Sequence, residues 1–178
     1  MRKLRNEELD RLSAEEMQKA DKYPLVIVLD NIRSMHNVGS AFRTADSFLC
    51  EKIILCGITA QPPHREIHKT ALGATDTVEW EYHDDTLKAI KSLKSLGYKI
   101  VTIEQADESI SLESFKPKSL EKLALVFGNE VKGVADTIVE ISDYVLEIPQ
   151  FGTKHSINVS VSIGIVIWDL VSKLKFNS

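Results

Sequence analysis

The sequence predicts an α/β domain in which a mostly parallel β-sheet is flanked by helices. Its 178 residues, of which 43% are hydrophobic and 27% are charged, suit one globular domain with its own core. Short continuous apolar runs indicate strands that are buried on both faces, as in a parallel sheet. Segments whose apolar residues recur every three or four positions alternate with these runs, which is typical of helices that connect parallel strands.

The N-terminal part is predicted to be a helical extension over residues 1–22, and residues 23–178 are predicted to form one domain. Asn6 is a suitable N-cap, and the apolar residues after it form an irregular stripe toward a helix end before Pro24. The continuous apolar run at residues 25–29 then predicts the first strand. No internal repeat or linker divides the chain.

A helix is predicted to follow this strand, with Asn37 as its N-cap and an apolar face over residues 38–49. The next strand covers residues 53–56. The segment after it, at residues 58–69, is polar and contains two prolines, so it is predicted to be an exposed loop.

The remaining chain continues the alternation of strands and helices. Asp84 or Asp85 is expected to cap a helix that runs to Gly97, and the last helix has the widest apolar face, over residues 159–174. The other predicted elements are strands at residues 78–82, 98–103, 123–127 and 144–148 and a short helix at residues 136–141.

Composition limits the class of function. The formal net charge of −4 argues against non-specific binding of polyanions, so any nucleic-acid site must be a local cluster of Lys and Arg. No apolar stretch is long enough to span a membrane and no signal peptide is evident, so we expect a cytoplasmic protein. Cys50 and Cys56 lack the neighbouring ligands of a zinc site, so we expect buried structural thiols and no metal.

Three turns rich in Gly, Asn and Ser follow predicted strands, at residues 31–46, 127–133 and 148–160. In open α/β sheets ligands bind beyond the carboxyl ends of the strands, so these loops are the expected site. Neither a G-x-G-x-x-G motif nor a P-loop is present, which disfavours a dinucleotide site or an NTPase. Taken singly, the glycines are explained by tight turns, and the Asn and Ser residues by helix caps.

Taken together, the three loops resemble the motifs of the SpoU family of RNA 2′-O-methyltransferases, within the knotted SPOUT class. The first motif is NVGSAFRTAD at residues 37–46, the second is LVFGNEVKGV at residues 125–134, and the third is IPQFGTKHSINVS at residues 148–160. The resemblance covers about residues 25–174.

This resemblance implies a parallel sheet whose C-terminal segment is threaded into a deep trefoil knot, which connection rules alone would not predict. It also implies that S-adenosylmethionine binds against the knot, largely through backbone groups. The cofactor site would then be lined by Ile103, Glu104, Gly128, Asn129, Ile148, Ser156 and Ile157.

The resemblance assigns the central catalytic role to Arg43, with Asn37, Glu130, Ser156 and Asn158 as the other reactive-site residues. Spacing alone would make Arg43 a solvated helix residue, because it lies off the apolar stripe of its helix. A guanidinium is effectively always protonated, so we expect Arg43 to stabilise the forming alkoxide, whether or not it takes the proton. The two asparagines would orient groups around the ribose. Glu130 is either a buried charge that holds Arg43 or the knot loop, or a direct substrate contact.

Structured RNA is the implied partner, with tRNA favoured over rRNA because only about twenty residues precede the first strand. Within tRNA, the resemblance favours the D-loop guanosine over the wobble nucleotide. The basic groups nearest the three loops would supply phosphate contacts, and they are Arg33, His36, Arg65, Lys69, Lys132, Lys154 and His155.

The resemblance also implies a homodimer in which the last helix and the first-motif helix pack at the interface. Val161 and Trp168 lie near the edges of the apolar face of the last helix, so they suit either such an interface or an intramolecular core. A non-catalytic RNA-binding or nucleotide-binding module that keeps the fold is the alternative function. A methyltransferase for a non-RNA substrate is a weaker alternative.

Overall fold

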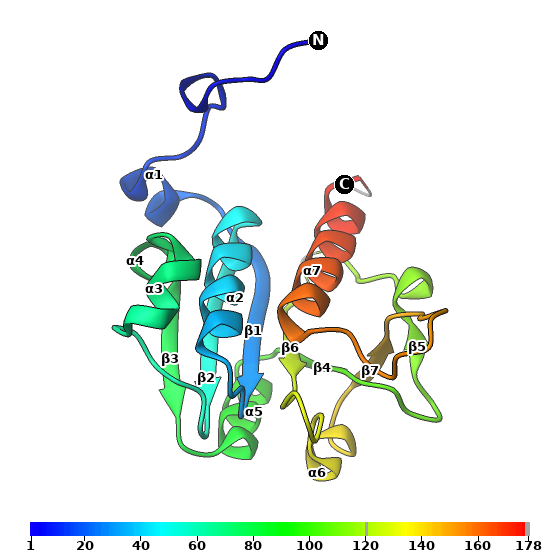
Figure 1. Cartoon of the computed structure of the whole chain (residues 1–178). Helices are drawn as coiled ribbons and strands as arrows, with labels where there is room; N and C mark the ends of the chain where they lie inside the picture. Colours follow the sequence, from blue (N-terminus) through cyan, green and yellow to red (C-terminus); the bar gives the residue numbers. More distant parts are fainter. Residues whose placement is uncertain (120, 177–178) are drawn as a thin grey trace.

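Seven parallel strands form the centre of the molecule in the computed structural model, which describes residues 1–119 and 121–176 (Figure 1). Their order across the sheet is β3-β2-β1-β6-β4-β7-β5, and each pair of neighbours is parallel. The predicted α/β class is therefore confirmed. The strands are β1 (Tyr23–Asp30), β2 (Cys50–Cys56), β3 (Glu79–His83), β4 (Lys99–Ile103), β5 (Ile110–Ser111), β6 (Leu123–Phe127) and β7 (Tyr144–Glu147).

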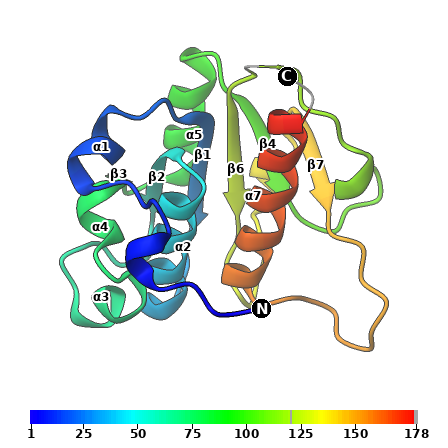
Figure 2. The ribbon, with the colours of Figure 1, turned by 90° about the horizontal axis from the view of Figure 1, so that it is seen from above.

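Helices cover both faces of this sheet and create two separate cores. Figure 2 shows α2 and α7 side by side over one face, with α5 on the other. The first face carries α2 (Met35–Ser47), α3 (Arg65–Ala71), α4 (Ala74–Thr77) and α7 (Val159–Phe176), and the second carries α5 (Thr86–Ser95) and α6 (Asp136–Val139). The remaining helical segments are η1 (Asn6–Glu8), α1 (Ala14–Lys19) and η2 (Leu112–Ser114).

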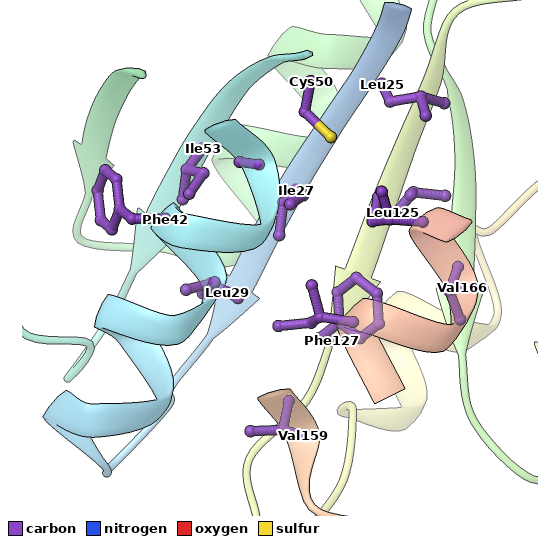
Figure 3. Close-up of a cluster of buried hydrophobic side chains, with 14 of the residues drawn as sticks. Leu25, Ile27, Leu29, Phe42, Cys50, Ile53, Leu125, Phe127, Val159 and Val166 are labelled. Carbon is purple, nitrogen blue, oxygen red and sulfur yellow. The ribbon is translucent and has the colours of Figure 1, made fainter. Parts of the chain in front are cut away.

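Strand β1 shows why the sequence contains continuous apolar runs. Figure 3 shows the core under α2 and α7, which contains Leu25, Ile27 and Leu29. Val26 and Val28 point to the opposite core, which α5 and α6 cover. Because both faces are dry, neither set of alternating positions can be polar, and burial of each such side chain contributes roughly 1.5–3 kcal/mol.

The N-terminal extension differs from the predicted single helix. Asn6 is not the N-cap of a long helix, because η1 ends at Glu8 and Asp10 has a left-handed φ of 40°. The short helix α1 begins after Ser13, whose hydroxyl and the carboxylate of Glu16 form a capping box. This extension lies at the end of the molecule opposite the carboxyl ends of the strands (Figure 1).

Two further predictions about local structure are wrong. Asn37 is not the N-cap of α2, because Ser34 occupies that position and its Oγ accepts the Asn37 N–H at 3.3 Å. Residues 58–69 are not entirely an exposed loop, because α3 begins at Arg65 and buries Ile67. The ring of His64 caps this helix by accepting the Glu66 N–H, a role that proline and charge content did not indicate.

The other predicted elements are confirmed to within a few residues. Asp85, the second of the two predicted caps, accepts the Lys88 N–H at the start of α5. Cys50 and Cys56 are buried free thiols, and burial raises the pKa of each to about 12. Within the described residues, no helix has both the length and the apolar character that crossing a membrane requires. The knot stays a prediction from the resemblance.

Candidate functional site

The carboxyl ends of the central strands meet at one edge of the sheet. Leu29 of β1 and Ile103 of β4 both pair with Phe127 of β6, and Ile103 also pairs with Leu146 of β7. Four loops therefore begin side by side, after β1, β4, β6 and β7. From β1 the chain adds β2 and β3 on one side of the sheet, and it then places β4 on the other side, beyond β6. Open α/β sheets bind ligands where the strand order reverses in this way.

A cleft with a volume of about 680 Å³ lies among three of these loops, after β4, β6 and β7. Its floor is apolar, with contributions from Phe127, Leu146 and Val159, and its rim is polar. All seven residues predicted to line the cofactor site border this one cleft, namely Ile103, Glu104, Gly128, Asn129, Ile148, Ser156 and Ile157. The structure thus brings these residues together, and the cofactor they bind stays a prediction.

The loop after β6 owes its shape to two glycines and one asparagine. A Cβ on Gly128 would lie 2.3 Å from the carbonyl carbon of Gly133 and from the Val134 nitrogen, so only glycine fits there. The side chain of Asn129 accepts the N–H groups of Val131 and Lys132 and donates to the Asn31 carbonyl. Because its oxygen accepts two N–H groups and its nitrogen donates to Asn31, Asn129 shapes the cleft wall and keeps one N–H for a ligand.

The loops after β4 and β7 form opposite walls of the cleft and are tied together. Glu104 accepts the N–H groups of Val134 at 3.1 Å and Gln105 at 2.9 Å. The amide of Gln105 donates to the carbonyl of His155 at 2.9 Å, which connects one wall to the other. Gln105 was not predicted from the sequence, and its position immediately after Glu104 is the signal that would have found it.

Glu130 joins the second motif to the first. Its carboxylate accepts the backbone N–H groups of Arg33 at 3.0 Å and Ser34 at 3.2 Å, and the Asn37 side-chain amide at 3.1 Å. Partial loss of hydration against the first motif would raise the pKa of this exposed carboxyl, but these hydrogen bonds hold the pKa below its ordinary value. A negative charge at the N-terminus of α2 also matches the direction of the helix dipole.

Asn158 joins the third motif to the same network. Its Nδ2 donates to Oδ1 of Asn37 at 3.3 Å, while its own Oδ1 accepts from the Ser160 N–H and hydroxyl. Asn158 thereby caps α7, as its sequence position suggested. One chain of hydrogen bonds, from Glu130 through Asn37 to Asn158, connects all three motifs at the edge of the cleft.

The structure decides one part of the alternatives for Glu130. Its side chain is exposed, so the expectation of a buried charge is wrong. Among the described residues, Glu130 forms no ion pair with Arg43, and its contacts hold the second loop against α2. The carboxylate also borders the cleft, so contact with a substrate stays a prediction.

Arg43 is the one predicted catalytic residue that lies outside this arrangement. It is exposed on α2 and borders a separate shallow depression with Phe48 and Lys69. It lies six positions after Asn37, which places the two side chains ~120° apart around the helix and ~9 Å apart along it. Within the part of the chain that the structure describes, its guanidinium has no hydrogen-bond or ion-pair partner.

The predicted basic residues divide into two groups. His36 and Lys69 both contact the carboxylate of Glu66, so their charges are partly compensated. The second group is exposed and makes no ion pair within residues 1–119 and 121–176. It consists of Arg33, Arg65, Lys132, Lys154 and His155. Among the described residues, no cluster of His, Cys, Asp and Glu that could hold a metal ion is found.

Asn31 is a second functional candidate that the sequence did not single out. It adopts a left-handed φ of 56°, and its carbonyl accepts the Asn129 amide at 2.7 Å. Its Oδ1 accepts the Ile58 N–H, and its Nδ2 donates to the buried carboxylate of Asp30. In the sequence, an Asn directly after a buried strand could have indicated this position, because Asn adopts the left-handed conformation more readily than most residues.

Comparison with known proteins gives consistent relatives. Residues 24–168 match the model of the SpoU rRNA Methylase family. A 23S rRNA (guanosine-2′-O-)-methyltransferase of Neisseria meningitidis is 32% identical over 151 residues, which are 85% of this chain and 59% of that protein. A tRNA (guanosine(18)-2′-O)-methyltransferase of Aquifex aeolicus is 31% identical over 157 residues, which are 87% of this chain and 72% of that protein.

Solved structures agree on the fold. The TrmH/SpoU tRNA modifying enzyme of A. aeolicus superimposes with a TM-score of 0.80 at 26% identity, over 92% of this chain and 81% of that chain. The SpoU methyltransferase AviRb of Streptomyces viridochromogenes, in complex with the cofactor AdoMet, gives a TM-score of 0.76 at 17% identity, over 92% and 65% of the two chains. The chain therefore has the fold of SpoU methyltransferases.

Proposed function

Because the chain belongs to the SpoU rRNA methylase family, we propose that it transfers a methyl group from S-adenosylmethionine to a ribose 2′-hydroxyl of RNA. The observation that carries this proposal is that the second and third motifs line one cleft, and that the chain from Glu130 to Asn37 to Asn158 ties the first motif to both. The named relatives that act on rRNA and on tRNA support the reaction class.

The cleft has the chemistry that the proposed cofactor needs. Ile103, Ile148 and Ile157 offer apolar walls for an adenosyl group, and Gly128, which has no side chain, borders the same cleft. Glu104 and Ser156 add polar atoms at the rim. Bound there, the cofactor would supply an electrophilic methyl group on a sulfonium, and the complex of AviRb with AdoMet supports this assignment by shared fold.

Methyl transfer requires help with the 2′-hydroxyl, which is a weak nucleophile at neutral pH. In this proposal Arg43 stabilises the oxygen as it loses its proton, and it also contacts an adjacent phosphate. Asn37 and Asn158 hold the ribose in line with the transferred methyl group. Attack of an alkoxide on a sulfonium cancels charge, so exclusion of water from the cleft favours the reaction.

A homodimer would bring together Arg43 and the cleft, which are separate within one chain. Arg43 does not border the cleft of its own chain, and the neighbouring helix α7 carries exposed apolar residues. Val161, Ile165 and Trp168 recur at helical spacing, and the Trp168 ring packs at 5.9 Å from that of Phe48 on the α2 side. A two-fold interface over this surface would cover it and bring Arg43 of one chain toward the cleft of the other.

We infer that tRNA is the substrate, with the D-loop guanosine preferred. Support comes from the A. aeolicus tRNA modifying enzyme, 81% of whose chain superimposes on this fold, and from the A. aeolicus guanosine(18) relative. The similar identity of the N. meningitidis rRNA enzyme makes rRNA the substrate to test beside it. The alternative, a non-catalytic RNA-binding module, predicts RNA binding without turnover.

The experiment combines binding with chemistry. Calorimetry with S-adenosylhomocysteine should show binding, with no preference for NAD or ATP. Transfer of labelled methyl groups should then modify an unmodified tRNA transcript faster than a 23S rRNA fragment, and mass spectrometry should find the label on a ribose. Cofactor binding with no transfer to either RNA would support the non-catalytic alternative, whereas no binding would contradict the proposal altogether.

A further inference from the structure

One side chain beside the cleft has no role in the fold. Phe151 lies in the loop at residues 149–158, between β7 and α7, and is 97% exposed. This loop projects from the body of the domain (Figure 2), and its residues Gln150 and His155 border the cleft. Phe151 packs against no other ring within the described residues, so folding gains nothing from its aromatic surface.

The surroundings of Phe151 favour a polyanionic partner. Lys154 lies on the same loop, and Lys132 lies on the facing loop after β6, where it borders the cleft. Neither lysine makes an ion pair within the described residues, although the chain as a whole carries a net charge of −4. Val131, which is 73% exposed and also borders the cleft, adds a second apolar side chain to this mouth.

RNA is the partner that matches both features. A nucleotide whose ribose enters the cleft must leave its base stack, and this unstacking costs a few kcal/mol. Exposed aromatic side chains offset such a cost by stacking on the freed base, while lysines bind the flanking phosphates. We propose that Phe151 stacks on the base of the target nucleotide, and that Lys132 and Lys154 bind the phosphates beside it.

This inference rests on the proposed function, because it assumes that an RNA ribose enters the cleft. Its test measures the affinity of an unmodified tRNA transcript by fluorescence anisotropy, in the presence of S-adenosylhomocysteine. Phe151→Ala should weaken RNA binding about 10-fold, because the variant loses the stacking of one base. Phe151→Trp should keep the wild-type affinity, and Phe151→Leu should be as weak as the alanine variant, because leucine has no aromatic face.

Leu96→Ala is the matched control, since Leu96 is 56% exposed at the end of α5, on the opposite face of the sheet. Its RNA affinity should equal that of the wild type. Lys132→Ala and Lys154→Ala should each lower the salt dependence of binding by about one phosphate contact, whereas the exposed Lys91→Ala on α5 should not. Affinity for S-adenosylhomocysteine should be unchanged in the variants of Phe151, Lys154, Leu96 and Lys91, because these residues do not border the cleft.

The outcomes separate the inference from the proposed function. A wild-type protein that methylates RNA, with a Phe151→Ala variant that binds RNA equally well, would overturn the stacking role alone. Wild-type affinity in Phe151→Leu would likewise exclude stacking. A wild-type protein that neither binds nor methylates RNA would instead overturn the proposed function, on which this role depends.

Discussion

The cleft and the outer surface of α2 and α7 are built in contrasting ways. At the cleft, backbone groups and polar side chains satisfy one another, and three motifs from distant parts of the sequence meet in one chain. On the outer surface, Arg43 has no partner within the described residues, and Trp168 is 60% exposed. We propose from this difference that one chain completes the cofactor site, whereas methyl transfer uses a second chain.

Among the variants that test this comparison, Arg43→Ala should have the largest effect on methyl transfer. If Arg43 stabilises the forming alkoxide, its loss should reduce single-turnover methylation roughly 10²-fold or more, with cofactor affinity almost unchanged. Arg43→Lys should also fail, because a point charge cannot replace a planar guanidinium. Rapid-quench methylation with saturating enzyme, beside calorimetry, measures both quantities.

Two controls make this result specific. Lys91→Ala removes an exposed cation from α5 on the opposite face and should leave turnover intact. Mixed dimers of Arg43→Ala with a cleft-defective chain should recover activity, because one of their two shared sites would be intact. Equal loss of turnover and cofactor binding in Arg43→Ala would return this residue to a structural role.

Trp168→Asp tests whether the outer surface is an interface. A charge at the C-terminal end of the exposed stripe of Val161, Ile165 and Trp168 should prevent association, so light scattering should fall from twice the 20.0 kDa chain mass to that mass. Turnover should fall to the level of Arg43→Ala, while the cleft of each chain still binds S-adenosylhomocysteine. A wild-type protein that is already monomeric at micromolar concentration would contradict a shared site.

Much of the fold follows from the sequence because its strands are buried on both sides. The runs at residues 25–29 and 123–127 admit no other assignment once their length and apolar continuity are considered. The polar connection after β4 was harder, since β5 has two residues, too few to show a period. The start of α2 was misassigned by three residues because Ser34 and Asn37 are both good caps, and only the tertiary contact with Glu130 separates them.

The site divides in the same way. Residues that act through loop geometry, such as Gly128 and Asn158, could be located from their motifs, because tight turns and caps are local features. The link from Asn37 to Glu130 spans 93 positions and depends on the neighbouring ends of β1 and β6, which local patterns do not encode. The position of Arg43 outside the cleft depends on how α2 is rotated against the sheet, and the motif alone does not predict this rotation.

Gly128→Ala should have the next largest effect, and it tests the self-contained part of the comparison. The added methyl group would meet the backbone of Gly133 and Val134 at 2.3 Å, so the loop must shift and distort the cleft. Affinity for S-adenosylhomocysteine should fall about 10-fold, equivalent to about 1.4 kcal/mol. Gly152→Ala is the matched control, because no atom lies within 4 Å of its Cβ position. Equal affinity in the two variants would show that the cleft tolerates a displaced loop.

Glu130→Gln should give the smallest effect, and pH provides its signature. The folded protein holds the pKa of Glu130 below its ordinary value, so the carboxylate stabilises the fold above that value and ceases to do so as pH falls through the lowered pKa. Glutamine retains one acceptor oxygen, so its cost at pH 7 should be only about 1 kcal/mol in the free energy of unfolding. Urea titrations of the two proteins should therefore differ at pH 7 and converge under acid conditions. Glu140→Gln, at an exposed carboxylate without hydrogen bonds in the described part of the chain, should show no such convergence. If the difference for Glu130→Gln were constant across pH, the charge of Glu130 would have no part in joining the second motif to α2.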